Sequence, residues 1–470
     1  MRYTDSGKCD VGVAGLGGIG LGIAQNISSH LYQVATCDPR PQKGEALAEG
    51  LAADPLLRAR TLPELAGMLR QPRIIFLFGE TEAPTDAMID ELLPHLTPRD
   101  LLIDAGDSHF KDAERRARKL SERSVEFMAL GIAGGEEAAR QGAMIVAGGG
   151  REVYARMRPL LEALATNVKG EPSVGHLGSA AAASFARMVH EGIECGLLQL
   201  VSEAFDLMQR TLELSEEQLQ DVSGAWRVGA LNDYRAEAFG HVFDPLDGGT
   251  EPRQMKARLN ALKNKPAVQQ FAQCARELGV PTPTIDAALG MQRYSARERQ
   301  RSLILTPCRH PSGRFGDDAD SVLDELRGAL YAAMIITYAE GFAVLAEASA
   351  KHRFRFDPVE IARVWKGGCS VRTELLDDIA GALRATPSLG NLLFDEDLAE
   401  KVMTHQECLR HAVWRAGELD TVAPGLLSSL DYLDSLRDAW LPVNLVQVQR
   451  DREQRCENRK WAPEETTLGF

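Results

Sequence analysis

The chain has 470 residues, more than a single hydrophobic core usually organises, so we expect two or three domains. Its formal net charge of -14 disfavours nucleic acid and anionic membrane surfaces as partners, and an anionic substrate would need a local cationic pocket. The cysteines are scattered without a CxxC pair or a Cys/His cluster, the N-terminus is charged, and no apolar run approaches the roughly 20 residues that span a bilayer. These features predict a soluble cytoplasmic protein without a metal site.

The first third of the chain alternates short apolar runs with helical stretches. Strands are expected from residue 11 and at 33–37, 74–78, 101–104, 125–130 and 144–148, and helical patterns follow them, as at 83–96 and 112–120. Strands that alternate with helices imply a parallel, doubly wound sheet. We therefore expect a Rossmann-like α/β domain over residues 1–180.

A glycine-rich turn follows the first expected strand and opens the first helix. It reads G-L-G-G-I-G and fits the G-x-G-x-x-G fingerprint of dinucleotide-binding loops. The first glycine permits the tight turn, the second lets the backbone approach the pyrophosphate, and the third allows close packing of helix against strand. The start of the helix supplies N–H donors to the phosphates. The cofactor-binding residues predicted in this turn are Gly15, Gly17, Gly18, Ile19 and Gly20.

The end of the second expected strand bears on the choice of cofactor. Asp38 can accept hydrogen bonds from the adenosine ribose and would repel a 2′-phosphate, which favours NAD. Arg40 argues the other way, because an arginine there could clamp the 2′-phosphate of NADP, although it could equally be a solvated loop residue. We expect NAD, with NADP as the alternative.

After Ser179 the strand patterns disappear, and long helical patterns rich in alanine and leucine continue to about residue 440. We expect an all-helical domain over residues 181–440 and a charged tail over 441–470 that is poor in helical periodicity and packs elsewhere. The segments 200–208 and 337–345 share a Glu-small-Phe core, which indicates either a duplicated helical unit or a coincidence of composition.

The first helix of this second domain carries polar and charged residues at steps of three and four. Such steps place side chains on one helix face, while the apolar residues between them form another face that can be buried. The face is either the wall of an active site or a solvated surface that holds an ion pair between Arg187 and Glu191. Its residues are Ser184, Arg187, His190, Glu191 and Glu194.

Several longer motifs give the chain a resemblance to one enzyme family over nearly its whole length. They are I-D-A-G-D-S-H-F-K-D-A at 103–113, G-G-E-E-A-A-R-Q-G at 134–142, M-V-H-E-G-I-E-C-G at 188–196, A-L-Y-A-A-M-I-I-T-Y-A-E-G-F at 329–342, V-W-K-G-G-C-S-V-R at 364–372 and L-V-Q-V-Q-R-D at 445–451. With these motifs the chain resembles the 6-phosphogluconate dehydrogenases, dimeric NADP- or NAD-dependent oxidative decarboxylases. The resemblance implies that the helical domain forms the substrate site and a homodimer, and that the tail reaches the partner's site.

The resemblance also implies catalytic roles on the polar helix. Family members use a lysine as general base and a glutamate as general acid; here those positions hold Arg187 and Glu194, while His190 is kept. A guanidinium stays protonated, so Arg187 can orient or neutralise an oxyanion but can hardly accept a proton. Either His190 acts as the base, or Glu191 and Glu194 form a carboxylate pair that yields one acid and one base. Alternatively, Arg187 and Glu191 only compensate each other.

The expected substrate pocket departs from the family in several places. The serine that helps to bind the substrate carboxylate is replaced by Ala133, before Gly134 and Gly135, and the asparagine close to both nicotinamide and substrate is replaced by Asp107. The tyrosine that binds phosphate is replaced by Cys195. Lys265 and Arg450 match phosphate-binding residues, Arg450 acting across the dimer, whereas another phosphate arginine aligns with Gln292, or with Arg293 after one residue of slippage.

The cofactor end therefore keeps the family pattern while the substrate end differs. We expect an NAD(P)-dependent dehydrogenase that oxidises, with or without loss of carbon dioxide, a small anionic sugar acid or β-hydroxy acid other than ordinary 6-phosphogluconate. Two alternatives are a reductase of an imine or ketone in specialised metabolism and a non-catalytic, nucleotide-binding dimer of the same family.

Overall fold

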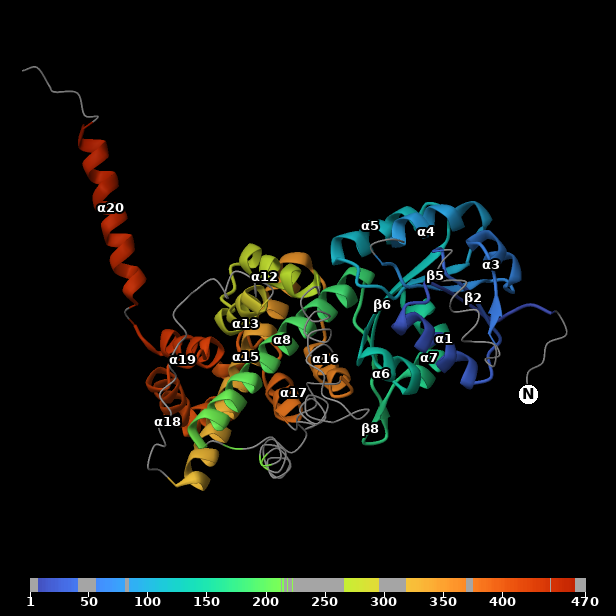
Figure 1. Cartoon of the computed structure of the whole chain (residues 1–470). Helices are drawn as coiled ribbons and strands as arrows, with labels where there is room; N and C mark the ends of the chain where they lie inside the picture. Colours follow the sequence, from blue (N-terminus) through green and yellow to red (C-terminus); the bar gives the residue numbers. More distant parts are fainter. Residues whose placement is uncertain are drawn as a thin grey trace, which may run out of the picture.

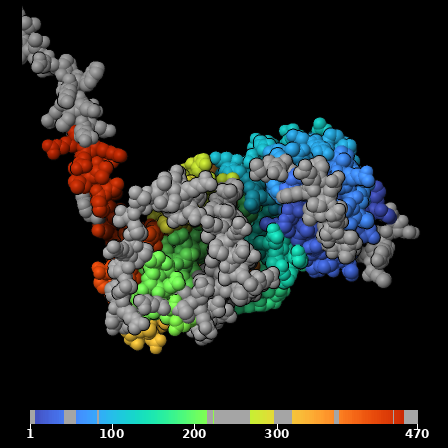
Figure 2. Space-filling view, viewed as in Figure 1, coloured from blue at the N-terminus to red at the C-terminus, as the bar shows by residue number. Residues whose placement is uncertain are grey.

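The structure, a computed structural model, describes residues 7–40, 56–80, 84–212, 214, 218, 222, 266–295, 318–368, 375–439 and 441–460. Two lobes lie side by side, an α/β lobe from the first part of the chain and a helical lobe from the second, and a C-terminal helix stands away from both (Figures 1 and 2).

The α/β lobe is built on one eight-stranded sheet with the strand order β10-β7-β6-β5-β4-β1-β2-β3. Its strands are β1 (Val11–Ala14), β2 (Val34–Cys37), β3 (Leu57–Arg58), β4 (Ile74–Leu77), β5 (Leu101–Asp104), β6 (Glu126–Ala133), β7 (Met144–Gly149) and β10 (Val174–His176). A short hairpin, β8 (Asn167–Val168) and β9 (Glu171–Pro172), precedes β10.

The sheet is parallel, as predicted, except at one pair of strands. The neighbouring pairs are parallel except β6 and β7, which pair antiparallel from Met128↔Gly149 to Ala133↔Met144. The connection between these two strands, residues 134–143, holds only the short helix α6, and a parallel crossover needs a dozen or more residues.

Helices cover both faces of the sheet (Figure 1). They are α1 (Gly18–Ser29), α3 (Leu62–Met68), α4 (Thr85–Leu92), the 3-10 turn η1 (Leu93–His95), α5 (Phe110–Ser121), α6 (Gly135–Gln141) and α7 (Arg151–Leu164). One buried apolar cluster joins the sheet to α1, α6 and α7, and another joins the opposite face to α3, α4 and α5. The sheet is therefore a buried middle layer, as apolar strands require.

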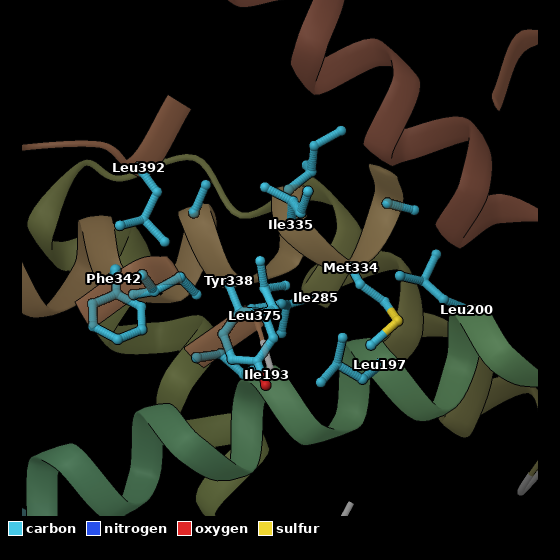
Figure 3. Packing of buried hydrophobic residues seen from close by; sticks show 14 of the residues in the cluster. Ile193, Leu197, Leu200, Ile285, Met334, Ile335, Tyr338, Phe342, Leu375 and Leu392 are labelled. Carbon is cyan, nitrogen blue, oxygen red and sulfur yellow. The ribbon is translucent and has the colours of Figure 1, made fainter. Parts of the chain in front are cut away.

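The helical lobe is organised around two long helices that pack on each other. Ile193, Leu197 and Leu200 of α8 point toward Met334 and Tyr338 of α15 (Figure 3). The helices of this lobe are α8 (Ala180–Leu212), α12 (Pro266–Leu278), α13 (Pro283–Ser295), α15 (Ala319–His352), α16 (Pro358–Trp365), α17 (Leu375–Ala385), the 3-10 turn η2 (Leu392–Phe394), α18 (Glu396–Glu418) and α19 (Pro424–Arg437).

The shared Glu-small-Phe segments occupy matching places on the two long helices. Glu203 of α8 is buried and accepts hydrogen bonds from the backbone N–H groups of Gly425 and Leu426, at the start of α19. Glu340 of α15 is fully buried and accepts from Thr284 and Ile285, at the start of α13. Glu203 of α8 thus caps a helix that follows α15 in sequence, and Glu340 of α15 caps a helix that follows α8. This reciprocal capping supports a duplicated, interlocked helical unit.

Helix α15 is long and apolar enough to span a membrane by length and composition alone. However, 94% of its most apolar window is buried inside the protein, as in the core helix of a soluble protein. Its apolarity is therefore explained by packing.

The tail is more helical than its periodicity predicts. Residues Pro442–Lys460 form α20, which projects from the helical lobe (Figure 1). The side chains of Val443, Leu445 and Val448 are exposed. Glutamine, arginine and glutamate favour helix without requiring an apolar face, so a helix that projects from the other described residues need not show the usual periodicity.

Candidate active site

The glycine-rich turn has the backbone geometry of a dinucleotide cradle. Gly15 has a φ of +89°, and a Cβ there would overlap the carbonyl oxygen of Phe78. A Cβ on Gly20 would overlap the carbonyl oxygen of Gly15. Gly17 is the N-cap of α1 and offers no side chain to the first N–H groups of the helix. These donors and the close backbone approach fit the pyrophosphate of a dinucleotide, for which Gly18 and Ile19 continue the cradle.

Asp38 lies at the end of β2 and is bound tightly by its neighbours. Its Oδ2 accepts a hydrogen bond of 2.8 Å from the backbone of Leu16, and its Oδ1 accepts bonds of 2.9 and 2.8 Å from the backbone and Nε of Arg40. Arg40 Nη2 also pairs with Oδ2 at 2.7 Å. Burial opposes ionisation of this carboxyl group, but the bonds from Arg40 and Leu16 outweigh it and lower the pKa of Asp38. Asp38, which was expected to favour NAD, and Arg40, which was expected to favour NADP, therefore form one ion pair.

Helix α8 carries the polar face across the junction of the two lobes. Its first half packs against β6 and β7 of the sheet, and its second half lies in the helical core. Gly131 of β6 makes the close approach possible, because a Cβ there would lie 2.7 Å from the Cβ of Arg187. Burial excludes the solvated alternative for most of this face, since Ser184, Arg187, His190 and Glu191 are each no more than 8% exposed.

Arg187 connects the helix to the loop that follows β5. Its Nη1 lies 2.9 Å from Asp107 Oδ1 and 3.9 Å from Glu191 Oε1, so the predicted pair with Glu191 exists but is the looser of the two. The Nη2 group is buried and has no hydrogen-bond partner among the residues that the structure describes. A buried donor without an acceptor is costly, so an oxygen atom of a ligand would stabilise it.

The loop that carries Asp107 is held by a buried network behind it. Asp104 Oδ1 accepts bonds from the backbone of Gly106 at 3.3 Å and the hydroxyl of Ser108 at 3.1 Å, and its Oδ2 accepts from Arg116 at 2.8 Å. Burial raises the pKa of Asp104, and these three donors offset part of that effect. The side chain of Asp107 itself is 64% exposed. The network thus fixes the loop, while the carboxylate of Asp107 remains accessible.

His190 is fully buried beneath the turn that follows α16. Its ring meets the ring of Trp365 edge to face at a centroid distance of 5.4 Å. A Cβ on Gly368 would lie 2.8 Å from His190 Nε2, so only glycine leaves room for the ring there. In the W-K-G-G motif, Gly368 is thus explained by packing over this histidine, whereas Gly367 is explained by packing against Ser173.

The substrate side of the site combines the substituted positions. Ala133 ends β6 and is buried, and Gly134 and Gly135 follow it with positive φ values of 123° and 73°, which favour glycine. Glu194 is half-buried one turn beyond Glu191. Cys195 Sγ accepts a hydrogen bond from Gln292 Nε2 at 3.1 Å.

Gln292 and its neighbour have different surroundings. Gln292 faces Cys195, whereas Arg293 is exposed, which is the arrangement expected of the ungapped alignment. The chain therefore has a glutamine and a cysteine in contact where the family resemblance implies an arginine and a tyrosine.

One predicted site residue, Arg450, does not join this cluster within one chain. Arg450 lies on α20 and is exposed on the helix that projects from the helical lobe (Figure 1). Lys265 lies outside the residues that the structure describes.

Two carboxylates beside the glycine turn, and the ring that covers His190, were not predicted from the sequence. Glu80 follows β4, and a Cβ on Gly17 would overlap its carboxylate. Glu136 lies at the start of α6, and a Cβ on Gly18 would overlap its carboxylate. Glu80 could have been noticed, because residues just beyond parallel strands line the ligand crevice. Trp365 lies in the motif at 364–372, which indicated the family but not a contact with His190.

A dinucleotide-binding sheet joined by one continuous helix to a helical lobe, with charged side chains at the joint, defines an NAD(P)-dependent oxidoreductase. The family model for the NAD binding domain of 6-phosphogluconate dehydrogenase matches residues 10–174, and that for the 6-phosphogluconate dehydrogenase C-terminal domain matches residues 183–452. The chain belongs to the 6-phosphogluconate dehydrogenase family. The predicted family, fold class and type of enzyme are thus confirmed.

The relatives cover nearly the full chain. A decarboxylating 6-phosphogluconate dehydrogenase of Synechocystis sp. is 35% identical over 94% of this chain and 93% of its own length. The NADP(+)-dependent, decarboxylating enzyme of Bacillus subtilis is 33% identical over 94% of this chain and 95% of its own. The Plasmodium falciparum 6-phosphogluconate dehydrogenase structure superimposes with a TM-score of 0.83 at 29% identity and covers 94% of this chain and 96% of that one.

Proposed function

We propose that the protein is a cytoplasmic NAD(P)-dependent dehydrogenase that oxidises a small anionic hydroxy acid other than ordinary 6-phosphogluconate. The observation that carries this proposal is the guanidinium of Arg187, which stands at the lysine position of the family and is bound to Asp107. A lysine can lose its proton and act as a base, whereas an arginine cannot. The hydroxyl group of the substrate must therefore lose its proton to another residue.

We assign proton acceptance to Asp107. His190 and Glu191 are almost completely buried, whereas the Asp107 carboxylate is 64% exposed and held by the Arg187 guanidinium. A general base has to reach the proton that it takes, and accessibility favours Asp107 over the other two. Arg187 would orient this carboxylate and, through its buried Nη2 group, bind an oxygen of the substrate. Glu194 keeps the position of the family acid.

The part of the site that would hold the other end of the substrate also supports a change of specificity. The contact between Cys195 and Gln292 puts two neutral side chains where the family resemblance implies phosphate ligands. A site that has lost charged donors binds a phosphate group less well, because each lost donor leaves part of the phosphate charge uncompensated. The substrate is therefore expected to differ from 6-phosphogluconate at its phosphate-bearing end.

The cofactor would be held by the glycine turn, Asp38 and Arg40, and when bound it supplies the acceptor for the substrate hydride. Relatives such as the Bacillus subtilis enzyme are NADP-dependent, which favours NADP over the NAD expected from Asp38. We propose that both dinucleotides bind, because Asp38 can accept hydrogen bonds from the ribose of NAD, and Arg40 can take the 2′-phosphate of NADP in exchange for its bond to Glu80.

We also propose a homodimer in which α20 reaches the partner's site. An exposed helix with apolar side chains such as Val443 and Leu445 gains stability by covering another chain, and the exchange would bring Arg450 to the substrate. Removal of residues 441–470 should abolish activity and weaken the dimer in light scattering. A truncated chain that keeps both would exclude the exchange.

The substrate proposal is tested with purified protein, both oxidised dinucleotides and a panel of hydroxy acids that includes 6-phosphogluconate. We expect another hydroxy acid to give the higher kcat/KM. Efficient turnover of 6-phosphogluconate would overturn the assignment of Arg187. Oxidation of reduced dinucleotide by ketones or imines alone would identify a reductase instead. Dinucleotide binding without turnover of any compound would identify a non-catalytic family member.

A further inference from the structure

Two carboxylates lie against the glycine turn, although this cradle is suited to anions. The carboxylate of Glu80 lies against Gly17, and that of Glu136 lies against Gly18, so closely that a Cβ on either glycine would overlap it. These glycines occupy the second position of the fingerprint and the start of α1, where the backbone approaches the pyrophosphate. A negative group at this place competes with the phosphates of a dinucleotide for the same N–H donors and helix dipole.

Glu80 also holds the guanidinium of Arg40, which stands at the proposed position of the ribose. Its Oε2 pairs with Arg40 Nη1, while Nε and Nη2 of the same guanidinium are bound to Asp38. The side chain of Arg40 is only 10% exposed, whereas that of Glu80 is 40% exposed. The bonds to Asp38 are the more buried ones, so the bond to Glu80 is the one that an incoming phosphate displaces most readily.

Glu136 is placed by the packing of α6 on α1. Gly22 of α1 lies under α6, where a Cβ would be 3.0 Å from the Cβ of Ala139. Asn26 of α1 donates a hydrogen bond of 3.1 Å to the carbonyl oxygen of Ala139. This contact fixes the start of α6 beside the turn, so Glu136 stays near the proposed pyrophosphate position, whereas Arg40 pairs with Asp38 and Glu80.

We propose that these two glutamates set the dinucleotide affinity of the protein, and that Glu80 in addition sets the preference between NADP and NAD. Glu80 competes with the 2′-phosphate for Arg40 and therefore weakens NADP more than NAD. Glu136 repels the pyrophosphate that both dinucleotides share and weakens them equally. This inference rests on the proposed dinucleotide cofactor and assigns its selectivity to a residue that lies outside the fingerprint.

The test is isothermal titration calorimetry of NAD+ and NADP+ on the full-length protein without substrate. Glu80→Gln should tighten NADP+ about fivefold to tenfold and NAD+ less than about twofold, since a partly exposed ion pair of this kind is modest in strength. Glu136→Gln should tighten both dinucleotides by the same factor of about two to three. Glu137→Gln is the matched control: Glu137 pairs with Gln141 on the same helix, and its replacement should change neither affinity.

A second variant shows whether Arg40 carries the effect. In an Arg40→Gln background, Glu80→Gln should no longer tighten NADP+ more than NAD+. An equal gain for both dinucleotides in the Glu80→Gln protein, or a loss of affinity for NADP+, would overturn the inference. If no form of the folded protein, checked by circular dichroism, binds either dinucleotide, the proposed function fails as well; if all forms bind equally, only this inference fails.

Discussion

The buried carboxyl group of Glu340 makes the stability of the helical lobe depend on pH. Its Oε1 accepts a bond of 2.9 Å from the backbone of Thr284, and its Oε2 accepts one of 3.1 Å from Ile285. Desolvation raises the pKa of Glu340 from its ordinary value of 4.5 to about 8, and the hydrogen bonds offset only part of that rise. The folded chain therefore keeps a proton between these two values, whereas the unfolded chain loses it.

The size of the effect follows from proton linkage. While the folded state binds one proton more than the unfolded state, the free energy of unfolding falls by about 1.4 kcal/mol per pH unit as the pH rises. Between pH 5.5 and pH 7.5 this amounts to about 3 kcal/mol. In Glu340→Gln the side chain cannot ionise, so this decline disappears. The amide accepts only one of the two N–H bonds, which costs about 1–3 kcal/mol at low pH.

Urea unfolding followed by circular dichroism at both pH values measures this effect. We expect the Gln variant to be less stable than the unsubstituted protein at pH 5.5 and equal to it, or more stable, at pH 7.5. Glu347→Gln is the control on the same helix, because Glu347 is exposed, and its stability should follow that of the unsubstituted protein. A difference between the Glu340 variant and the unsubstituted protein that is independent of pH would refute the reasoning.

Three further predictions concern the site. Gly20→Ala places a Cβ against the carbonyl oxygen of Gly15, so it should abolish NAD+ and NADP+ binding in calorimetry while the circular dichroism spectrum stays unchanged; retained binding would contradict the cradle. Gly131→Ala would push α8 from the sheet and should cost about 1–3 kcal/mol in urea unfolding, whereas Gly150→Ala, whose nearest contact would be 3.5 Å away, should cost less than half of that. The double variant Cys195→Tyr with Gln292→Arg should increase the affinity for 6-phosphogluconate about tenfold or more, since it restores two phosphate donors; equilibrium dialysis that finds no gain would argue against the altered phosphate end.

Local patterns in the sequence predicted the glycine turn, the polar face of α8 and the strands around them. Each depends on interactions between residues close in the chain: a turn that needs glycine, side chains three and four positions apart, and apolar runs that form buried strands. The direction of β7 was not readable in this way, because it depends on a pairing with β6 across a short connection. The helix in the tail was missed since its residues favour helix without an apolar periodicity.

The order of residues along the chain is enough to place a dinucleotide cradle before a helix with charged and titratable side chains, and to show that two helical segments share a Glu-small-Phe core. Which of these groups meet depends on the folded chain. Asp107 and Arg187 pair across the two lobes, Glu203 and Glu340 cap helices far away in the chain, and Glu80 reaches Arg40 beside the glycine turn. Such contacts join residues tens to hundreds of positions apart, and their geometry is set by the packing of whole helices on the sheet and on each other rather than by local propensity.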